Sequence, residues 1–485
     1  MGTFKGPRFE NKIWERGLAT VALALLGWAL NKAVVPLFFG VDFIFGSVAV
    51  LIAIATLGRA SGILVAVVAA AHTYFLWGHP YAAIVLVGEA VFVGAIWKRT
   101  YANIPIASAI YWLFLGIGQI WFYYHFLLGM DETGAQFAAV KQACNGILNA
   151  LAVHLLITYG PLARWSSAPI RFRGSVFQPV FGFLAAAAIL PALLFFTLNS
   201  RQMVSQIEEN IRLRLDTIAT ALSMSSERWR DQNMAFVRTA AAVAERSGLS
   251  DRTELQRLLE KLNATAHDIF SIFVVGKNGV SIAFNPISNA YGISNLGIDL
   301  SDRSYFQSLK SDEQDSAVSP IFMGRGAYRE PLIVVAHAIR EKKAFAGLVG
   351  GAINLRHLQD LLSAVKGEGK YTATILDEFG KVIASSDPGL HSMDDFSQER
   401  LGEITVDENG FFYRNLMEED NPMNQWKHTW MGNITDVEGP GHWRLVVEIP
   451  FAPAQASLYQ QYLKSLGGLL LLLVGVILVS VRIAW

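Results

Sequence analysis

A short run of polar and aromatic side chains in the second half of the chain has the chemistry needed to hold a small anion. The run Asp302-Arg-Ser-Tyr-Phe306 places a guanidinium group two residues from a phenol, and Tyr328-Arg-Glu-Pro331 adds a similar pair further along. A guanidinium group binds carboxylate or phosphate oxygens through two parallel hydrogen bonds, and a phenol adds a directional hydrogen bond and an apolar wall. These residue types indicate a binding site for a small polar molecule.

A purely structural explanation of the same residues is also available. Asp302 is placed to cap a short helix predicted over residues 305–310, and Arg303 to pair with a neighbour. His337 lies on the strand predicted after Pro331 and is equally well placed to face the site or to face away from it. The sequence leaves both alternatives open.

The residues around this run are expected to form two α/β modules. Residues 269–284 and 371–386 each follow the order apolar strand, polar glycine-containing turn, strand, which is typical of a β-hairpin. The other predicted strands are 332–339 and 346–353 in the first module and 411–415, 432–436 and 443–449 in the second, with a joining helix over 355–365. A helix predicted over 201–245 has apolar residues at intervals of three and four, which suits either the core of the domain or pairing with a second copy of the chain.

The rest of the chain has the composition of a membrane protein. Its hydrophobic fraction is 52%, above the about 45–50% of soluble proteins. Long apolar segments predict eight membrane spans, over residues 18–39, 41–57, 62–77, 81–97, 106–128, 137–159, 176–198 and 463–481. The second to fourth are short, so they are expected to be tilted or partly re-entrant.

Basic residues near the ends of these spans predict the orientation. The Lys and Arg residues of 5–16, 59, 98–100 and 164–173 all fall on one side, which is the cytoplasmic side by the positive-inside rule. The N-terminus is then cytoplasmic and residues 201–461 are outside. The chain ends shortly after the last span, so we expect an output domain to follow in the complete protein.

Order, spacing and topology together resemble a double Cache domain, a PAS-like extracytoplasmic sensor with a long N-terminal helix. The expected fold class is therefore an α-helical membrane bundle of about eight spans plus an α/β (α+β) double Cache domain. The predicted divisions are a six-span module (1–175), a seventh helix (176–199), the Cache domain (200–458; distal module 246–353, proximal module 366–450) and an eighth helix (459–485).

This resemblance implies which residues line the distal pocket. Matching positions are Arg303, Tyr305, Tyr328 and Arg329, and His337 is added from its place on the strand after Pro331. Members of the family that bind amino acids often carry an aspartate near the end of the last pocket strand, where this chain has Asn354. An organic acid is therefore a better expectation than an amino acid.

A second set of polar residues lies in the predicted six-span module. The candidates are Lys32, Asp42, His72, Glu89, Lys141, Asn145 and Asn149. Lys141, Asn145 and Asn149 recur every four residues and share one helix face. Such groups either join helices by hydrogen bonds or line a small-molecule site or ion path. The region also resembles the multi-span sensor modules that precede signalling domains in bacterial receptors.

Several classes of function are not supported by the sequence. We find no basic stripe or nucleic-acid motif, no metal-ligand spacing, no cofactor motif and no recognisable catalytic set. The single cysteine, Cys144, rules out an intrachain disulfide.

The sequence therefore favours a bacterial cell-membrane receptor over a catalytic chain. We expect it to be a lipid-embedded homodimer that drives a histidine kinase of a two-component system or, as the alternative, a diguanylate cyclase. A solute transporter or transport-coupled sensor that uses the six-span bundle is the rival hypothesis.

Overall fold

The computed structural model describes residues 13–38, 41–96, 103–159, 177–266, 268–289, 291–311, 314–325, 329–364, 371–396, 406–415 and 428–484. The chain forms two compact units, which are described separately. One consists of Met1–Glu208, Asn415–His428 and Phe451–Trp485, and the other of Glu209–Arg414 and Thr429–Pro450. The basic segments 98–100 and 164–173, used above to predict the orientation, lie outside the described residues.

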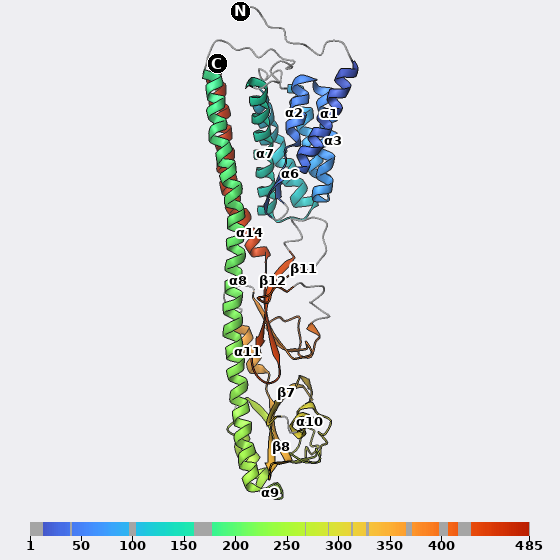
Figure 1. The fold of residues 1–485 in the computed structure, drawn as a ribbon, viewed down its shortest axis with the longest axis vertical. Helices are drawn as coiled ribbons and strands as arrows, with labels where there is room; N and C mark the ends of the chain where they lie inside the picture. The colour runs from blue at the N-terminus through green and yellow to red at the C-terminus, as the bar shows by residue number, and fades with distance from the viewer. Residues whose placement is uncertain are drawn as a thin grey trace, which may run out of the picture. The chain divides into compact units, whose positions relative to one another are not determined.

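The first unit is a bundle of apolar helices (Figure 1). In chain order they are α1 (Ile13–Lys32), α2 (Gly46–Thr56), α3 (Arg59–Trp77), α4 (Tyr81–Ile96), α5 (Ile104–Tyr111), the π-helical turn η1 (Trp112–Gly116), α6 (Ile117–Phe122), the π-helical turn η2 (Tyr123–Leu127), α7 (Glu132–Tyr159) and α14 (Ala452–Ala484). Within the described residues, five helices are long and apolar enough to cross a membrane: 13–32, 59–77, 104–127, 132–158 and 452–479. Helices α2 and α4 are apolar but shorter.

The second predicted span, 41–57, is not a single helix. Its first residues form β2 (Val41–Phe43), which pairs antiparallel with β1 (Val35–Phe38), and α2 follows. The 11 residues of α2 extend over about 16 Å, roughly half of a bilayer core. Between β2 and α2, the backbone of Ile44 finds its hydrogen-bond partners in a side chain of α7. The amide of Asn145 accepts from the Ile44 N–H at 2.9 Å and donates to the Ile44 C=O at 2.7 Å, as buried backbone groups in a membrane require.

The second unit contains two antiparallel sheets. The longest helix, α8 (Phe177–Ser247), begins in the first unit and ends in this one, so the predicted seventh span and the predicted helix over 201–245 form one continuous helix. The first sheet has the order β4-β3-β8-β7-β5, with β6 on β7. Its elements are α9 (Arg252–Asn263), β3 (Ile269–Gly276), β4 (Ser281–Asn285), α10 (Ser304–Lys310), β5 (Ser316–Val318), β6 (Phe322–Met323), β7 (Pro331–Glu341) and β8 (Ala344–Ile353).

The second sheet has the order β10-β9-β13-β12-β11. Its elements are α11 (Arg356–Ala364), β9 (Thr372–Leu376), β10 (Val382–Ser385), β11 (Phe411–Asn415), β12 (Thr429–Val437) and β13 (Trp443–Pro450). Both predicted hairpins, β3–β4 and β9–β10, are confirmed. The short strands β5 and β6 were not predicted, because two or three residues carry no readable period. Helix α9 was not predicted either, although its buried Leu255 and Leu259 recur at helical spacing and Asp251 caps its start.

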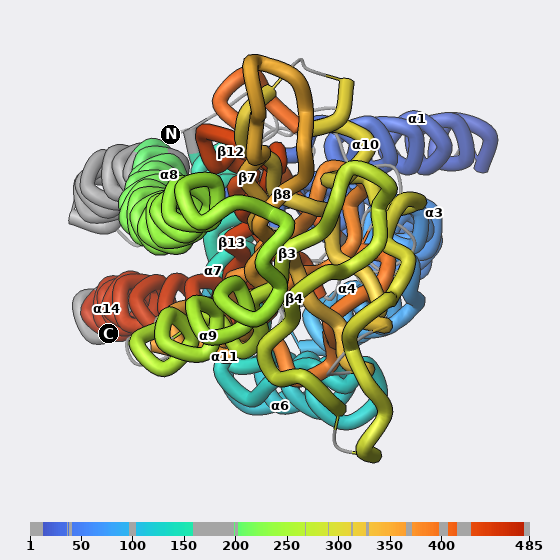
Figure 2. The backbone as a smooth tube through the Cα atoms, turned by 90° about the horizontal axis from the view of Figure 1, so that it is seen from below, coloured from blue at the N-terminus to red at the C-terminus, as the bar shows by residue number. Residues whose placement is uncertain are grey.

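The two faces of the first sheet pack against different helices, which lie on opposite sides of it (Figure 2). On one face, Val334 and Ala336 join Phe306 and Leu309 of α10 in one apolar cluster. On the other face, a Cβ at Gly351 would lie 3.0 Å from a methyl group of Val237 in α8. Alternation along β7 therefore decides whether a residue faces α10 or α8.

Glycine at position 347 is required by the close approach of β3. A Cβ at Gly347 would lie 2.3 Å from the backbone oxygen of Val275, and a strand backbone cannot move aside as a flexible side chain can. We expect Gly347→Ala to lower the free energy of unfolding by about 1–3 kcal/mol, measured by urea unfolding. Gly276, the cross-strand partner of Gly347, is the control, since its nearest contact would be the Asn278 side chain at 3.2 Å. Equal losses for the two alanine variants would contradict this explanation.

Candidate ligand-binding site

A partly open cavity with a volume of about 40 Å³ lies on the α10 side of the first sheet. Most of its walls are apolar or aromatic, and the charged groups among its lining residues are two arginines. The lining residues are Phe270, Ser271, Phe273, Phe284, Ile298, Leu300, Arg303, Tyr305, Phe322, Gly324, Arg325, Leu332, Val334 and Ala352. An apolar cavity with a few convergent polar groups has the general form of a small-molecule site.

Arg303 is the half-buried cation of this cavity. Its guanidinium carbon lies 4.2 Å from the centre of the Phe322 ring, and Nη2 donates a long hydrogen bond of 3.4 Å to the backbone oxygen of Met323. Its Nε is buried and has no partner among the described atoms. Burial, together with the nearby charge of Arg325, lowers the pKa of Arg303. Arginine keeps its charge in proteins, so this guanidinium group is a poorly solvated cation with an unbonded N–H. An anion in the cavity would offset the charge and accept a hydrogen bond.

Asp302 does not cap the helix, contrary to the structural explanation given above. Helix α10 begins at Ser304, its N-cap is Arg303, and no side chain caps it. Asp302 instead accepts two hydrogen bonds from Arg325, at 2.9 and 2.7 Å, and these bonds lower the pKa of the Asp302 carboxyl group. A bidentate partner 23 residues away satisfies this carboxylate better than one backbone N–H would.

Tyr305 forms the inner wall of the cavity. Its side chain is 2% exposed, and its ring centre lies 6.4 Å from that of Phe273 and 6.3 Å from that of Phe322. Burial raises the pKa of the Tyr305 hydroxyl group. The phenol is therefore neutral at physiological pH and able to donate a hydrogen bond.

Other residues predicted for the pocket are not brought together with Arg303 and Tyr305. Tyr328 lies outside the described residues, and Arg329 is exposed and is not a lining residue. His337 is on the α8 face of the sheet, where it shares a 2.7 Å hydrogen bond with Ser316 and where burial and the charge of Arg238 lower its pKa. Asn354 is exposed, and its side chain accepts a 3.0 Å hydrogen bond from the backbone N–H of Arg356, at the start of α11.

Arg325 was not predicted from the sequence. It lies one residue before the 326–331 stretch from which pocket residues were chosen. The only available signal was its basic side chain beside a glycine-containing loop, which does not reveal its pairing with Asp302.

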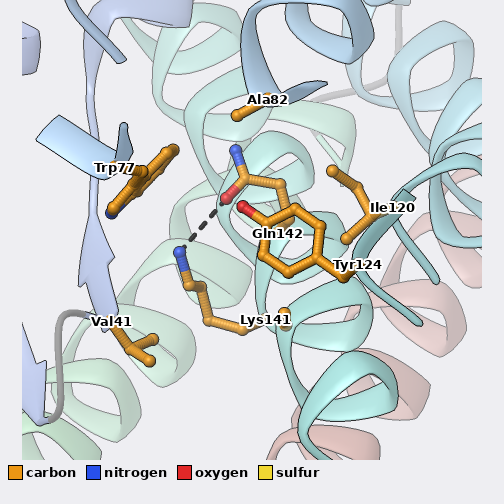
Figure 3. Close-up of a pocket in the computed structure, with 8 residues that line it drawn as sticks. Val41, Trp77, Ala82, Ile120, Tyr124, Lys141 and Gln142 are labelled. Carbon is orange, nitrogen blue, oxygen red and sulfur yellow. Dashed lines mark hydrogen bonds between the residues drawn. The ribbon is translucent and has the colours of Figure 1, made fainter. Parts of the chain in front are cut away.

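The polar residues of the helical unit separate into one group and three isolated members. The group lies where α7 contacts β2 and the start of α2, and its members are Asp42, Lys141, Asn145 and Asn149. The Lys141 ammonium group donates a hydrogen bond to the backbone oxygen of Asp42 at 2.6 Å, and the Asn149 amide donates one to the backbone oxygen of Ile44 at 3.0 Å. Lys141 also donates to the side-chain oxygen of Gln142 at 3.2 Å (Figure 3). The isolated members are Lys32, which is exposed, His72, whose ring packs edge-on against Trp28 at 4.9 Å, and Glu89, which accepts hydrogen bonds from Ser108 and Trp112 at 2.6 and 2.8 Å.

The sheets, the long helix and the cavity define a ligand-binding domain attached to apolar helices. A family model described as Cache domain matches residues 199–458, more than half of the chain. The chain therefore belongs to the Cache domain family, whose domains are extracytoplasmic. None of the curated proteins matches this chain.

Solved structures of similar domains come from bacterial chemoreceptors. The ligand-binding domain of Pseudomonas fluorescens CtaA in complex with L-isoleucine is 16% identical, with 52% of this chain and 98% of that chain covered and a TM-score of 0.42. The corresponding domains of Pseudomonas aeruginosa PAO1 are 17% identical: PctC in complex with GABA (49% and 98% covered, TM-score 0.40) and PctB in complex with L-arginine (51% and 91% covered, TM-score 0.42).

Proposed function

We propose that this chain is the ligand-sensing and transmembrane signalling region of a bacterial receptor, and that it binds a small organic anion in the cavity beside α10. The observation that carries the proposal is the pair of cations, Arg303 and Arg325, on the wall of an otherwise apolar cavity. The buried Nε of Arg303 and the hydroxyl group of Tyr305 supply further donors. Carboxylate oxygens accept hydrogen bonds from all of these groups.

An organic acid fits this cavity better than an amino acid. Binding an α-amino acid requires an acceptor for the ammonium group as well as donors for the carboxylate. Asp302, the nearby carboxylate, is already bonded twice to Arg325. Asn354, at the position where an aspartate is common in amino-acid-binding members of the family, already accepts a hydrogen bond from the backbone N–H of Arg356.

The architecture we propose is a double Cache domain, with the ligand in the distal module (about 246–353) and the proximal module (about 366–450) between it and the last span. The N-terminus and the basic loops would be cytoplasmic, and residues 201–461 would face the outside of a bacterial cell membrane crossed by eight spans. Covalent continuity supports signalling through α14, because this helix begins two residues after β13 ends.

In this receptor, ligand binding changes the population of two conformations of a lipid-embedded homodimer. The change biases a cytoplasmic output, which we propose to be a histidine kinase, with a diguanylate cyclase as the alternative. A transporter function of the helical bundle is the rival proposal. Accumulation of a solute by vesicles that carry residues 1–175 alone would favour the rival.

The charge of the ligand provides the direct test. The full chain in lipid nanodiscs would be screened by thermal unfolding against mono- and dicarboxylic acids, their uncharged amides and the corresponding amines. We expect acids to raise the unfolding temperature and amides of the same shape to have little effect, because a ligand stabilises only the state that binds it. Stabilisation by amides or amines equal to that by the acids would overturn the proposal.

Neutralising Asp302 should strengthen the binding of an anion. Asp302 competes with an incoming carboxylate for Arg325, so Asp302→Asn is expected to increase the affinity for the best acid of the screen roughly two- to fivefold. Isothermal titration calorimetry measures this affinity. Asp315→Asn is the matched control, because it breaks an ion pair with Arg340 on the same sheet, away from the lining residues. Unchanged or weaker affinity in Asp302→Asn would show that Arg325 does not contact the ligand.

A further inference from the structure

The loop that joins β5 to β6 forms part of the wall of the cavity beside α10 and also contacts the second sheet. We name residues 318–323 the β5–β6 segment. The Ser319 N–H donates to the backbone oxygen of Val334 in β7, and the Ser319 hydroxyl group accepts from the Val334 N–H, both at 2.9 Å. Phe322 pairs with Leu332 of β7, and Phe322, Leu332 and Val334 all line the cavity. A displacement of the β5–β6 segment therefore changes the cavity wall.

Asp377 connects this segment to the second sheet. It is fully buried, at 0% exposed, and begins the turn between β9 and β10. Its carboxylate oxygen Oδ2 accepts a hydrogen bond of 3.3 Å from the N–H of Ile321, the residue before Phe322. The other oxygen, Oδ1, accepts two hydrogen bonds within the turn, from the N–H groups of Phe379 and Lys381, both at 2.9 Å. One carboxylate therefore holds both its own turn and the β5–β6 segment.

Burial makes this link between the sheets costly to break. Both Ile321 and Asp377 are buried. A hydrogen bond to an ionised acceptor is stronger than one between neutral groups, and a buried donor that loses its partner keeps the full cost of its desolvation. The turn between β12 and β13 approaches the same segment, since a Cβ at Gly441 would lie 3.2 Å from a methyl group of Val318. We therefore expect the β5–β6 segment and the second sheet to move together.

The turn before β11 repeats the arrangement without the link to the first sheet. Like Asp377, Asp407 begins a turn of the form Asp-Glu-x-Gly. Its Oδ1 accepts hydrogen bonds from the N–H groups of Asn409 and Phe411, at 3.0 and 2.9 Å, whereas its Oδ2 pairs with Arg212 of α8. The turn itself thus uses one carboxylate oxygen, and the contact of the second oxygen of Asp377 with the first sheet is a separate feature.

We propose that Asp377 is a positioning residue for the anion site and couples that site to the second sheet, a role that rests on the proposed binding of an organic anion beside α10. The guanidinium carbon of Arg303 lies 4.2 Å from the centre of the Phe322 ring. An anion drawn to Arg303 would therefore shift Phe322 and, with it, the adjoining N–H of Ile321. Asp377 accepts from this N–H, so the shift reaches the β9–β10 turn. Coupling between two sites is reciprocal, so the link also raises the affinity for the anion.

Asp377→Asn removes the link while keeping the turn. The amide oxygen of asparagine can accept both hydrogen bonds of the turn, but its NH₂ group cannot accept from the N–H of Ile321. We expect the affinity of the full chain in lipid nanodiscs for propionate, measured by titration calorimetry, to fall about two- to tenfold. Asp407→Asn is the matched control, because it changes the same kind of turn away from the first sheet, and it should leave the affinity unchanged. Equal losses in the two variants, or no loss in Asp377→Asn, would contradict the proposal.

Hydrogen–deuterium exchange of the full chain distinguishes a failure of the coupling from a failure of anion binding. Propionate or succinate, with propionamide as the uncharged control, would be added to the wild type and to Asp377→Asn at concentrations that saturate each protein. We expect an acid to slow exchange at residues 303–306 and 318–323 in both proteins, but at residues 377–381 in the wild type alone.

Two results would overturn the coupling and leave anion binding intact. One is protection of residues 377–381 by the acid that persists in Asp377→Asn. The other is a wild type in which the acid protects residues 303–306 but not residues 377–381. If neither acid protects residues 303–306 of the wild type, or if propionamide protects them equally well, both the proposed anion site and its coupling through Asp377 are wrong.

Discussion

Replacing Arg414 by methionine should lower the free energy of unfolding of the Cache domain by about 3–5 kcal/mol, the usual effect of removing one partner of a buried ion pair. Both Nε and Nη2 of Arg414 bond Oε1 of Glu448 at 2.9 Å. The two side chains are only 5% and 2% exposed, and the guanidinium group also lies 5.5 Å from the centre of the Trp430 ring. The substitution therefore leaves a buried carboxylate without this cation.

Urea-dependent proteolysis of the full chain measures this loss, and a double variant identifies its cause. Arg414→Met combined with Glu448→Leu removes the stranded charge, so it should recover most of the lost stability. Arg212→Met is the matched control, because the ion pair of Arg212 with Asp407 is 34% and 40% exposed and exposed pairs contribute little. A double variant that is as unstable as Arg414→Met would show that packing against Trp430, rather than the charge of Glu448, dominates.

Local patterns in the sequence were sufficient to predict the longer strands of the Cache domain, but not the short strands β5 and β6, the helix α9 or the contacts between the elements. The β3–β4 and β9–β10 hairpins were predictable because a glycine-containing turn between two apolar runs is a local signal. The role of Asp302 could not be predicted, because its hydrogen-bond partner Arg325 is distant in sequence. The orientation of His337 was equally undetermined, since alternation along a strand shows which residues share a face but not what covers that face.

The helical unit shows a similar limit. The four-residue spacing of Lys141, Asn145 and Asn149 predicted a shared helix face but not its partners. These are backbone oxygens of Asp42 and Ile44 and, for Asn149, also the Ser47 hydroxyl group of α2 at 2.7 Å. The predicted second span, 41–57, is predominantly apolar, and hydropathy alone cannot distinguish a full span from a strand followed by a half-length helix.

Substitution of Arg303 should weaken anion binding to the Cache cavity more than any other single change there. Arg303→Ala removes the half-buried guanidinium group over Phe322, and hydrogen bonds to charged groups contribute enough that we expect affinity to fall roughly ten- to hundredfold. Arg303→Lys should retain part of the affinity, because lysine keeps the charge but cannot bind a carboxylate bidentately. Titration calorimetry with the best acid from the screen measures both variants.

Helix α10 is expected to survive these substitutions, because Arg303 caps it without a side-chain hydrogen bond. A loss of affinity then reflects the cavity and not a damaged fold, and thermal unfolding of the unliganded variants checks this. Arg329→Ala is the decisive comparison: Arg329 was also predicted from the sequence, but it is exposed and does not line the cavity. Full affinity in Arg329→Ala with a large loss in Arg303→Ala would support the cavity beside α10. The reverse pattern would place the ligand against the loop before β7 instead, and the guanidinium group of Arg303 would then serve only to hold Phe322 and the backbone of Met323.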